Sequence, residues 1–152
     1  MKKIKFKYRG EQYEINANAL TNKYDGTGKE IIIRCVDVAS IMKQFVKKKY
    51  PKIEVWASSD RYAGGSSVSV NIAMKSGEQV TESVYREIAE FGDSMRSGTF
   101  DGMTDSFNYR NDKPTTDNST PVTFYTNYIF VDNRAMWNYK YDETKRKFTK
   151  TN

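Results

Sequence analysis

Carboxylate side chains are the groups whose spacing in this sequence most directly indicates chemistry. Asp101 and Asp105 lie four residues apart in the segment FDGMTD, and Asp93 precedes them. Such oxygen ligands could bind a hard cation. The spacing is not that of an EF-hand, and a folded loop explains the same residues, with Asp101 capping backbone amides while Phe100 and Met103 anchor it. We therefore predict no metal site and no cofactor.

The sequence contains no histidine, which removes the most common general base at neutral pH and the imidazole ligands of most catalytic zinc sites. Its single cysteine, Cys35, cannot form an internal disulfide or a thiolate zinc site, and is typical of a reducing compartment. Catalysis by Tyr, Lys, Asp or Glu stays possible, because a nuclease site can be assembled from carboxylates on separate loops. No spacing combines a nucleophile, a base and an oxyanion donor, so we predict no catalytic residues.

Basic and aromatic side chains offer a different chemistry, the binding of nucleic acid. Cations neutralise phosphates, and exposed rings stack on unpaired bases. Tyr and Arg also dominate many protein-binding surfaces, so a protein partner fits the same residues. We predict a nucleic-acid or partner-binding surface that contains Lys3, Lys5, Lys7, Arg9, Lys43, Lys47, Lys48, Trp56, Arg61 and Tyr62.

The overall composition is compatible with this prediction. The formal net charge is +6, from 25 Lys and Arg against 19 Asp and Glu, which favours polyanionic partners, although a solubilising surface gives the same balance. A length of 152 residues with 38% hydrophobic and 29% charged residues indicates one domain, residues 1–152. No apolar run approaches the roughly 18 residues that span a bilayer. The basic N-terminus lacks the apolar segment of a signal peptide, so we predict a cytoplasmic location.

The segment 52–74 is the centre of the predicted fold. Apolar residues occupy every second position on both sides of a polar bend that contains Asp60, Gly64 and Gly65. Alternation of this kind predicts two strands, each with one buried face and one mostly polar face. Helical patterns on both sides have apolar stripes that such a sheet would cover.

The N-terminal third is predicted to form strands. Residues 3–9 alternate between apolar residues and cations, and with residues 12–17 they predict a hairpin. The cations of the first strand either contact phosphates or prevent sheets from associating edge to edge, and both interpretations stay open. Residues 31–33 predict a short buried strand.

Two amphipathic helices are predicted. The first begins at Asp37 as N-cap and ends near Tyr50, before Pro51, with lysines on its exposed side. The second begins after Thr81 as N-cap and ends at Gly92 or Gly98. Its expected buried stripe consists of Val84, Ile88, Phe91 and Met95.

The C-terminal third is predicted to contain a long connection, 99–121, an apolar central strand with two hydrophobic faces, 122–131, and a charged tail, 142–152. Taken together, the elements predict an α+β fold. We expect an antiparallel β-sheet with two α-helices packed on one face, in the order β-β-β-α-β-β-α-β.

Three segments together resemble the large polyvalent protein-associated domain 29 family of phages, plasmids and other mobile elements. They are the bend in SSDRYAGGSSVSV, the FDGMTD that follows the second helix, and the late YIFVDNR. The resemblance covers roughly residues 36–137, with helix, hairpin, helix and late strand in matching order, and leaves 1–34 and the tail outside. No established catalytic residues of the family can be transferred. The resemblance implies a mobile-element accessory protein that acts against host defences.

These observations lead to a main functional prediction and two alternatives. The main one is a non-catalytic protein that binds and inhibits a host nucleic-acid-directed defence complex, of the anti-CRISPR or anti-restriction type. Its partner would be a host ribonucleoprotein or the guide RNA or DNA, in a bacterial cytoplasm. The alternatives are a small metal-dependent nuclease that acts on DNA or RNA, and an accessory module for replication or conjugation. None involves a membrane or a small-molecule substrate.

Overall fold

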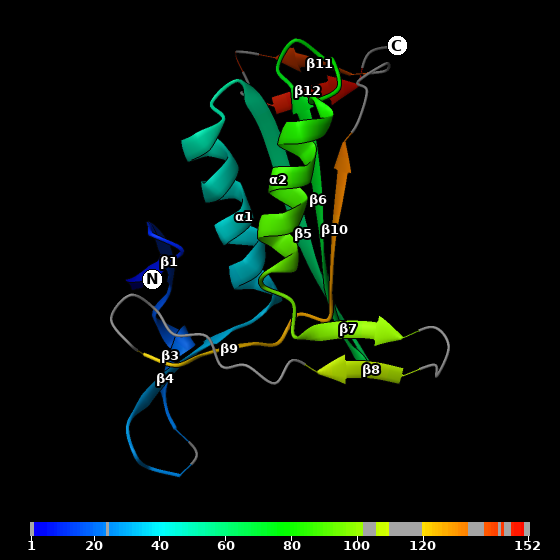
Figure 1. Cartoon of the computed structure of the whole chain (residues 1–152). Helices are drawn as coiled ribbons and strands as arrows, with labels where there is room; N and C mark the ends of the chain where they lie inside the picture. Colours follow the sequence, from blue (N-terminus) through cyan, green and yellow to red (C-terminus); the bar gives the residue numbers. More distant parts are fainter. Residues whose placement is uncertain are drawn as a thin grey trace.

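The computed structural model describes residues 2–23, 25–101, 106–109, 120–133, 139–142, 144 and 147–150 (Figure 1). The fold is α+β, as predicted. Its elements in chain order are β1 (Lys3–Tyr8), β2 (Glu11–Asn16), the 3-10 helix η1 (Ala17–Ala19), β3 (Leu20–Asn22), β4 (Lys29–Ile33), α1 (Cys35–Lys49), β5 (Ile53–Tyr62), β6 (Gly65–Met74), α2 (Glu82–Asp93), β7 (Gly98–Asp101), β8 (Ser106–Tyr109), β9 (Val122–Phe124), β10 (Tyr128–Asn133), β11 (Tyr139–Asp142) and β12 (Lys147–Lys150).

The central sheet has the strand order β10-β6-β5. β5 and β6 form the predicted antiparallel hairpin, with Ala57 opposite Val70. β10 runs parallel to β6 and places Val131 opposite Val70, so this sheet is mixed and not purely antiparallel. The two described helices pack on one face of it, as predicted, with α1 against β5 and β6 and α2 against β10 (Figure 1).

The prediction of one central strand at 122–131 is wrong. The chain divides there into β9, which pairs parallel with β4 in the sheet β3-β4-β9, and β10, which lies beside β6. The segments outside the central sheet also contain more strands than expected. The 99–121 connection includes most of β7 and all of β8, which pair as a hairpin, and β11 and β12 form another near the C-terminus.

A buried polar junction explains the break between β9 and β10. Thr126 and Asn127 are buried in the middle of the apolar run. The Asn127 N–H donates to the Ser66 carbonyl at 3.1 Å, and Asn127 Oδ1 accepts from the Ser66 N–H at 3.0 Å. The neighbouring Gly65 has φ +156°, and a Cβ there would lie 2.3 Å from Asn127 Oδ1. The glycine-rich bend is therefore the place where β6 receives the chain that continues into β10.

The observed helix boundaries differ from the predicted ones at the start of α1 and at the end of α2. The N-cap of α1 is Arg34, and Asp37 lies within the first turn, where its carboxylate accepts a hydrogen bond from the Arg34 N–H at 3.3 Å. α2 begins after Thr81, as predicted, but runs through Gly92. A Cβ at Gly92 would lie 3.1 Å from a methyl carbon of Ile129, so this glycine permits close packing on β10 instead of ending the helix.

The predicted apolar stripes of both helices form much of the core. Val38, Ile41, Met42 and Val46 of α1 are fully buried, as is Ile88 of α2. Within the described part of the chain, neither helix is long and apolar enough to cross a membrane.

Candidate functional site

The cations of β1 lie on the outer side of the N-terminal hairpin. Alternation along the strand buries Phe6 and Tyr8 and exposes Lys3, Lys5 and Lys7. These three lysines form a row, which we call the lysine row.

Helix α1 holds this hairpin through the free edge of β2. The Gln44 side chain accepts from the Glu14 N–H at 2.8 Å and donates to the Glu14 carbonyl at 2.7 Å. Lys48 donates to the Gln12 carbonyl, and its ammonium lies 5.3 Å from the centre of the Tyr13 ring. Lys48, which the sequence predicts on the binding surface, therefore serves to attach the hairpin to α1.

Asp37 makes a third contact of the same kind. Its carboxylate is hydrogen-bonded by the backbone of Asn16, in addition to that of Arg34. Burial raises the pKa of Asp37, and these two hydrogen bonds oppose the rise. Position 44 lies about two helical turns after position 37, and position 48 about one turn after position 44. A single face of α1 therefore supplies all three contacts.

A groove of about 520 Å³ lies between α1 and β5, and we call it the lysine groove. Lys43 and Lys47, one helical turn apart on α1, line one wall, and Ser59 lines the other. None of the described lining residues is acidic. They are Val36, Ala39, Ser40, Lys43, Gln44, Lys47, Ala57, Ser58 and Ser59. Ammonium and hydroxyl groups without a carboxylate make an environment that favours an anion such as phosphate.

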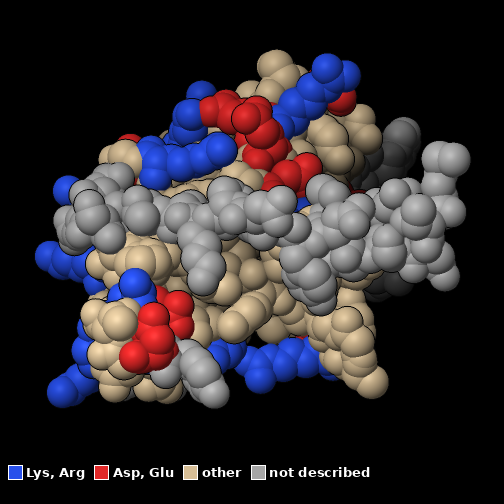
Figure 2. Space-filling model, turned by 60° about the horizontal axis from the view of Figure 1, so that its bottom comes forward, with Lys and Arg blue, Asp and Glu red and all other residues tan. Residues whose placement is uncertain are grey.

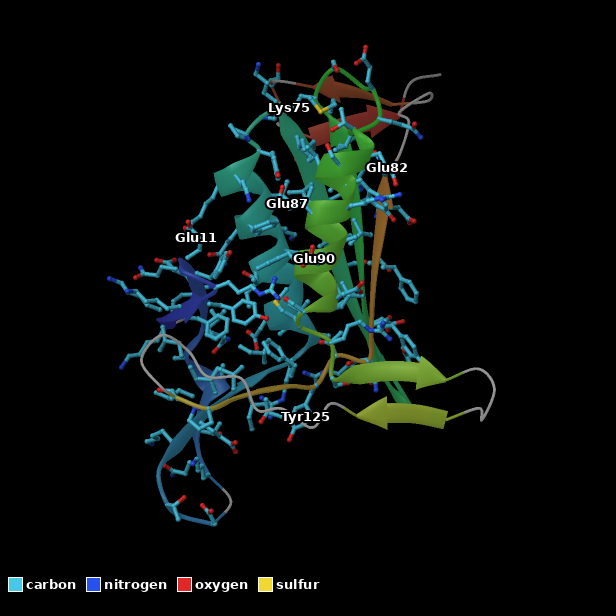
Figure 3. All side chains as sticks on the ribbon, in the orientation of Figure 1. Glu11, Lys75, Glu82, Glu87, Glu90 and Tyr125 are labelled. Atoms are coloured by element: carbon cyan, nitrogen blue, oxygen red, sulfur yellow. The ribbon has the colours of Figure 1, made fainter. Side chains whose placement is uncertain are left out.

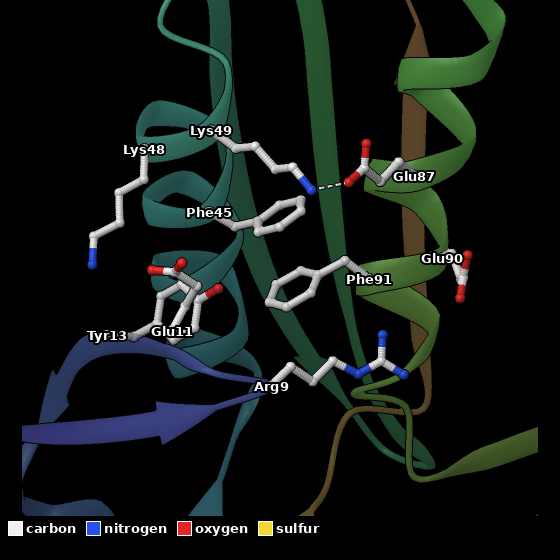
Figure 4. Close-up of a pocket in the computed structure, with 9 residues that line it drawn as sticks. All are labelled: Arg9, Glu11, Tyr13, Phe45, Lys48, Lys49, Glu87, Glu90 and Phe91. Atoms are coloured by element: carbon white, nitrogen blue, oxygen red, sulfur yellow. Dashed lines mark hydrogen bonds and ion pairs between the residues drawn. The ribbon is translucent and has the colours of Figure 1, made fainter. Parts of the chain in front are cut away.

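A larger cavity of about 720 Å³ lies between the hairpin, the end of α1 and α2 (Figure 4). Its wall includes the stacked rings of Phe45 and Phe91, with centroids 4.0 Å apart. The nine lining residues include three cations and three carboxylates: Arg9, Glu11, Tyr13, Phe45, Lys48, Lys49, Glu87, Glu90 and Phe91. Glu11 comes from the hairpin, and Glu87 and Glu90 come from α2 (Figure 3). This balance of charges does not favour a polyanion.

The titratable groups of this cavity brace the two helices. Glu87 forms an ion pair with Lys49 and accepts a hydrogen bond from the Tyr50 hydroxyl. These two donors lower the pKa of Glu87, while burial and the Glu87 carboxylate raise the pKa of Tyr50 to about 12. Burial, together with the charge of Glu11, also raises the pKa of Tyr13 to about 12. Because both pKa values are raised, both tyrosines stay protonated at neutral pH and neither is suited to act as a base there.

The other predicted residues lie elsewhere. Trp56 is half-buried on the side of β5 that faces away from the helices, and Arg61 and Tyr62 are exposed where β5 ends. Figure 1 places β1 and the end of the β5–β6 hairpin on opposite sides of the molecule. Arg9 lines the larger cavity and not the lysine groove. The predicted surface is therefore divided into separate regions.

The charge distribution agrees with this division. On the face drawn in Figure 2, Lys and Arg side chains lie around the margin, with acidic groups gathered between some of them.

Within the described residues, no group of three or more Cys, Asp or Glu side chains could hold a metal ion. Residues 102–105, and the side chains of Phe100 and Asp101, lie outside the described set, so the interpretation of FDGMTD stays a prediction.

Sequence reasoning missed Gln44 and Ser59 at the lysine groove, and it missed the exposure of Phe130 on β10. Gln44 and Ser59 belong to no motif, and only the pairing of α1 with β2 and β5 gives them a role. Phe130 falls in the segment predicted to be a central strand, but its side chain is 54% exposed. Its position alternates with the buried Ile129 in the structure, but both residues are apolar, so the sequence contains no signal that Phe130 is exposed.

Comparison with known proteins adds no relative. No protein-family model matches the chain, and neither the curated proteins nor the solved structures give a significant match. The resemblance to the domain 29 family therefore stays a prediction.

Proposed function

We propose that this protein is a non-catalytic inhibitor that contacts the nucleic acid of a host defence complex. The lysine groove is the observation on which this proposal depends. Lys43 and Lys47 provide two cations one turn apart, and the Ser40 hydroxyl belongs to the same wall. Point charges neutralise phosphate oxygens, and hydroxyl groups donate hydrogen bonds to them.

The lysine row is a second group of exposed cations, on the hairpin that α1 holds. Gln44 lines the lysine groove and also binds the backbone of Glu14 on β2. The hairpin with its lysine row is thus attached at the border of the groove. Glu14 on β2 lies opposite Lys5, so one exposed carboxylate stands beside the row.

The biological context of the proposal comes from the sequence. A net charge of +6, the absence of histidine and the resemblance to a mobile-element family support an accessory protein that obstructs a defence complex. An inhibitor of the anti-CRISPR or anti-restriction type would act in the bacterial cytoplasm, where guide RNA, target DNA and the defence ribonucleoprotein are present.

Fluorescence anisotropy with labelled RNA and DNA, at several salt concentrations and with and without Mg²⁺, tests nucleic-acid contact. We expect intact nucleic acid and an affinity that falls as salt rises. The double variant K43E/K47E should weaken binding by at least about tenfold, because two phosphate contacts become repulsive. The control K29E/K52E changes the net charge equally at two exposed lysines outside the groove.

The outcomes separate the alternatives. Equal losses in both double variants would mean that only net charge matters and would contradict a role for the groove. Mg²⁺-dependent cleavage would identify a nuclease and overturn the non-catalytic proposal. Inhibition is measured with a purified guide-RNA-directed nuclease and its target DNA. The wild-type protein should slow target cleavage, and K43E/K47E should not.

A further inference from the structure

The face of the central sheet opposite the helices carries aromatic rings. Side chains alternate along strands, so the packing of Ile129 and Val131 into the core beneath α2 directs Tyr128 and Phe130 to the other face of β10. The same alternation places Tyr62 there, at the end of β5. Both described helices lie on the opposite side (Figure 1).

Small residues separate these rings. In register across the sheet, Phe130 lies beside Ser69, which lies beside Ser58. One step along, Tyr128 lies beside Ser67, which lies beside Asp60. The small side chains of these serines therefore lie between the Tyr128 and Phe130 rings on β10 and the Tyr62 ring on β5. We call this arrangement the ring trough.

The rings of the trough are accessible and partly held in place. Phe130 is 54% exposed and Tyr62 is 48% exposed. The Tyr128 and Phe130 rings are stacked, with centroids 6.1 Å apart and planes 9° from parallel. The Arg96 guanidinium lies 5.6 Å from the Tyr128 ring centre, and its Nε donates to the Asn127 carbonyl at 3.0 Å. A ligand would therefore meet a Tyr128–Phe130 pair that is already stacked.

We propose that the ring trough binds unpaired bases of single-stranded nucleic acid. Flat rings exposed on a sheet stack on bases, and hydroxyl groups and the Asp60 carboxylate can bond to base edges, where amino groups act as donors. The carboxylate would repel a phosphate but suits a base. The net charge of +6 and the Arg96 guanidinium, which lies against the Tyr128 ring, complement a polyanionic strand. Duplexes are excluded as the preferred ligand, because their bases are stacked within the helix.

The inference rests on the proposed nucleic-acid function and adds the class of strand. The two sites divide the contacts between them. The lysine groove takes phosphates, whereas the ring trough takes bases. Stacking depends less on salt than phosphate contact does, so the two can be measured separately.

The test uses the full-length protein and a single strand that carries 2-aminopurine, whose fluorescence is quenched by stacking. We expect quenching on binding, and tighter binding to the single strand than to a duplex of the same sequence. F130A and Y62A should each weaken single-strand binding by about tenfold, as expected for the loss of one stacked base. Duplex binding should change little.

Y125A is the matched control, because Tyr125 is also an exposed aromatic residue, at 53%, but precedes β10 and lies outside the trough. Equal binding of single strand and duplex, unaffected by F130A, would overturn the inference and leave the proposed function intact. Loss of all nucleic-acid binding in the wild-type protein would overturn both. A wild-type dimer that F130A converts to a monomer in light scattering, with strand binding unchanged, would show that the face is a self-association surface and would also overturn the inference.

Discussion

The side-chain amide of Gln44 makes both hydrogen bonds to the Glu14 backbone that a neighbouring antiparallel strand would make. α1 thus replaces a third strand at the edge of β2. An edge closed in this way is protected from pairing with another chain. The outer edge of β1, which carries the lysine row, pairs with no other described strand, so both a protective and a binding role of these lysines stay open.

Substitution of Gln44 should loosen the hairpin. Q44A removes two hydrogen bonds from an exposed strand edge, where water partly replaces them, so we expect the free energy of unfolding to fall by about 1–2 kcal/mol. Urea denaturation measures the change, and hydrogen exchange at the Glu14 amide should become faster. Q12A, which truncates an exposed glutamine on the same strand, should be close to neutral. Equal effects of Q12A and Q44A would contradict the edge contact.

Two adjacent glycines should differ sharply in their tolerance of alanine. G65A places a Cβ against Asn127 Oδ1 and displaces the partner of the buried Ser66 N–H, so a loss of about 1–3 kcal/mol is expected. G64A meets no atom within 4 Å and should change stability little. Thermal or urea unfolding of both variants makes the comparison. A stable G65A protein would mean that the junction between β6 and β10 is not built as described.

The turn of the N-terminal hairpin contains a strained residue. Arg9 has φ 52° and Gly10 has φ 82°, the positive pair of a tight two-residue hairpin turn. Asparagine tolerates this conformation better than arginine, so R9N should raise the free energy of unfolding by about 0.5–1 kcal/mol, measured by urea denaturation. R9Q removes the same guanidinium but keeps a side chain unsuited to positive φ, and it should show no such gain.

The lysine row should contribute to nucleic-acid binding through charge alone. The triple variant K3Q/K5Q/K7Q should lower affinity and reduce the slope of log affinity against log salt concentration by up to about 3, one for each phosphate that a lysine no longer neutralises. The fold should persist, because all three side chains are exposed. An unchanged affinity and slope would show that the row has only a protective role in the sheet.

Alkaline pH should destabilise the protein through Tyr50 and Tyr13. Their pKa values are raised to about 12 from 10.0, so the folded state retains protons that the unfolded chain releases. The resulting stabilisation is complete below pH 10 and is lost as the pH rises toward 12. In E87Q, the pKa of Tyr50 should move toward 10, which absorbance at 295 nm or NMR titration detects. E90Q, on the same helix, should leave it unchanged.

Local patterns in the sequence were sufficient to predict the two hairpins and the two helices. The alternation of apolar and polar residues in 52–74 predicts the hairpin that is observed as β5 and β6, and α2 begins directly after its N-cap Thr81, as expected. Both depend on interactions between residues close in the chain. The lysine groove, by contrast, needs α1 to pack on β5, and no spacing in the sequence reports which serine faces Lys43.

The division of residues 122–131 was not predicted because parallel strands pair at long range. Val131 lies opposite Val70, and nothing local distinguishes an edge strand from a central one in an apolar run. A signal was nevertheless present in Thr126 and Asn127, whose polar side chains interrupt the run. Polar residues buried in such a position require partners, and Ser66 is the partner of Asn127.

The parallel pairing of β10 with β6 also has a consequence during synthesis on the ribosome. β6 ends at Met74, whereas its partner begins at Tyr128, so the nascent chain exposes a hydrogen-bonding edge of β6 for more than fifty residues of translation. Closing that edge requires a long loop to be organised first, which slows the step. We expect the newborn polypeptide to be most vulnerable to chaperone capture or aggregation in this interval.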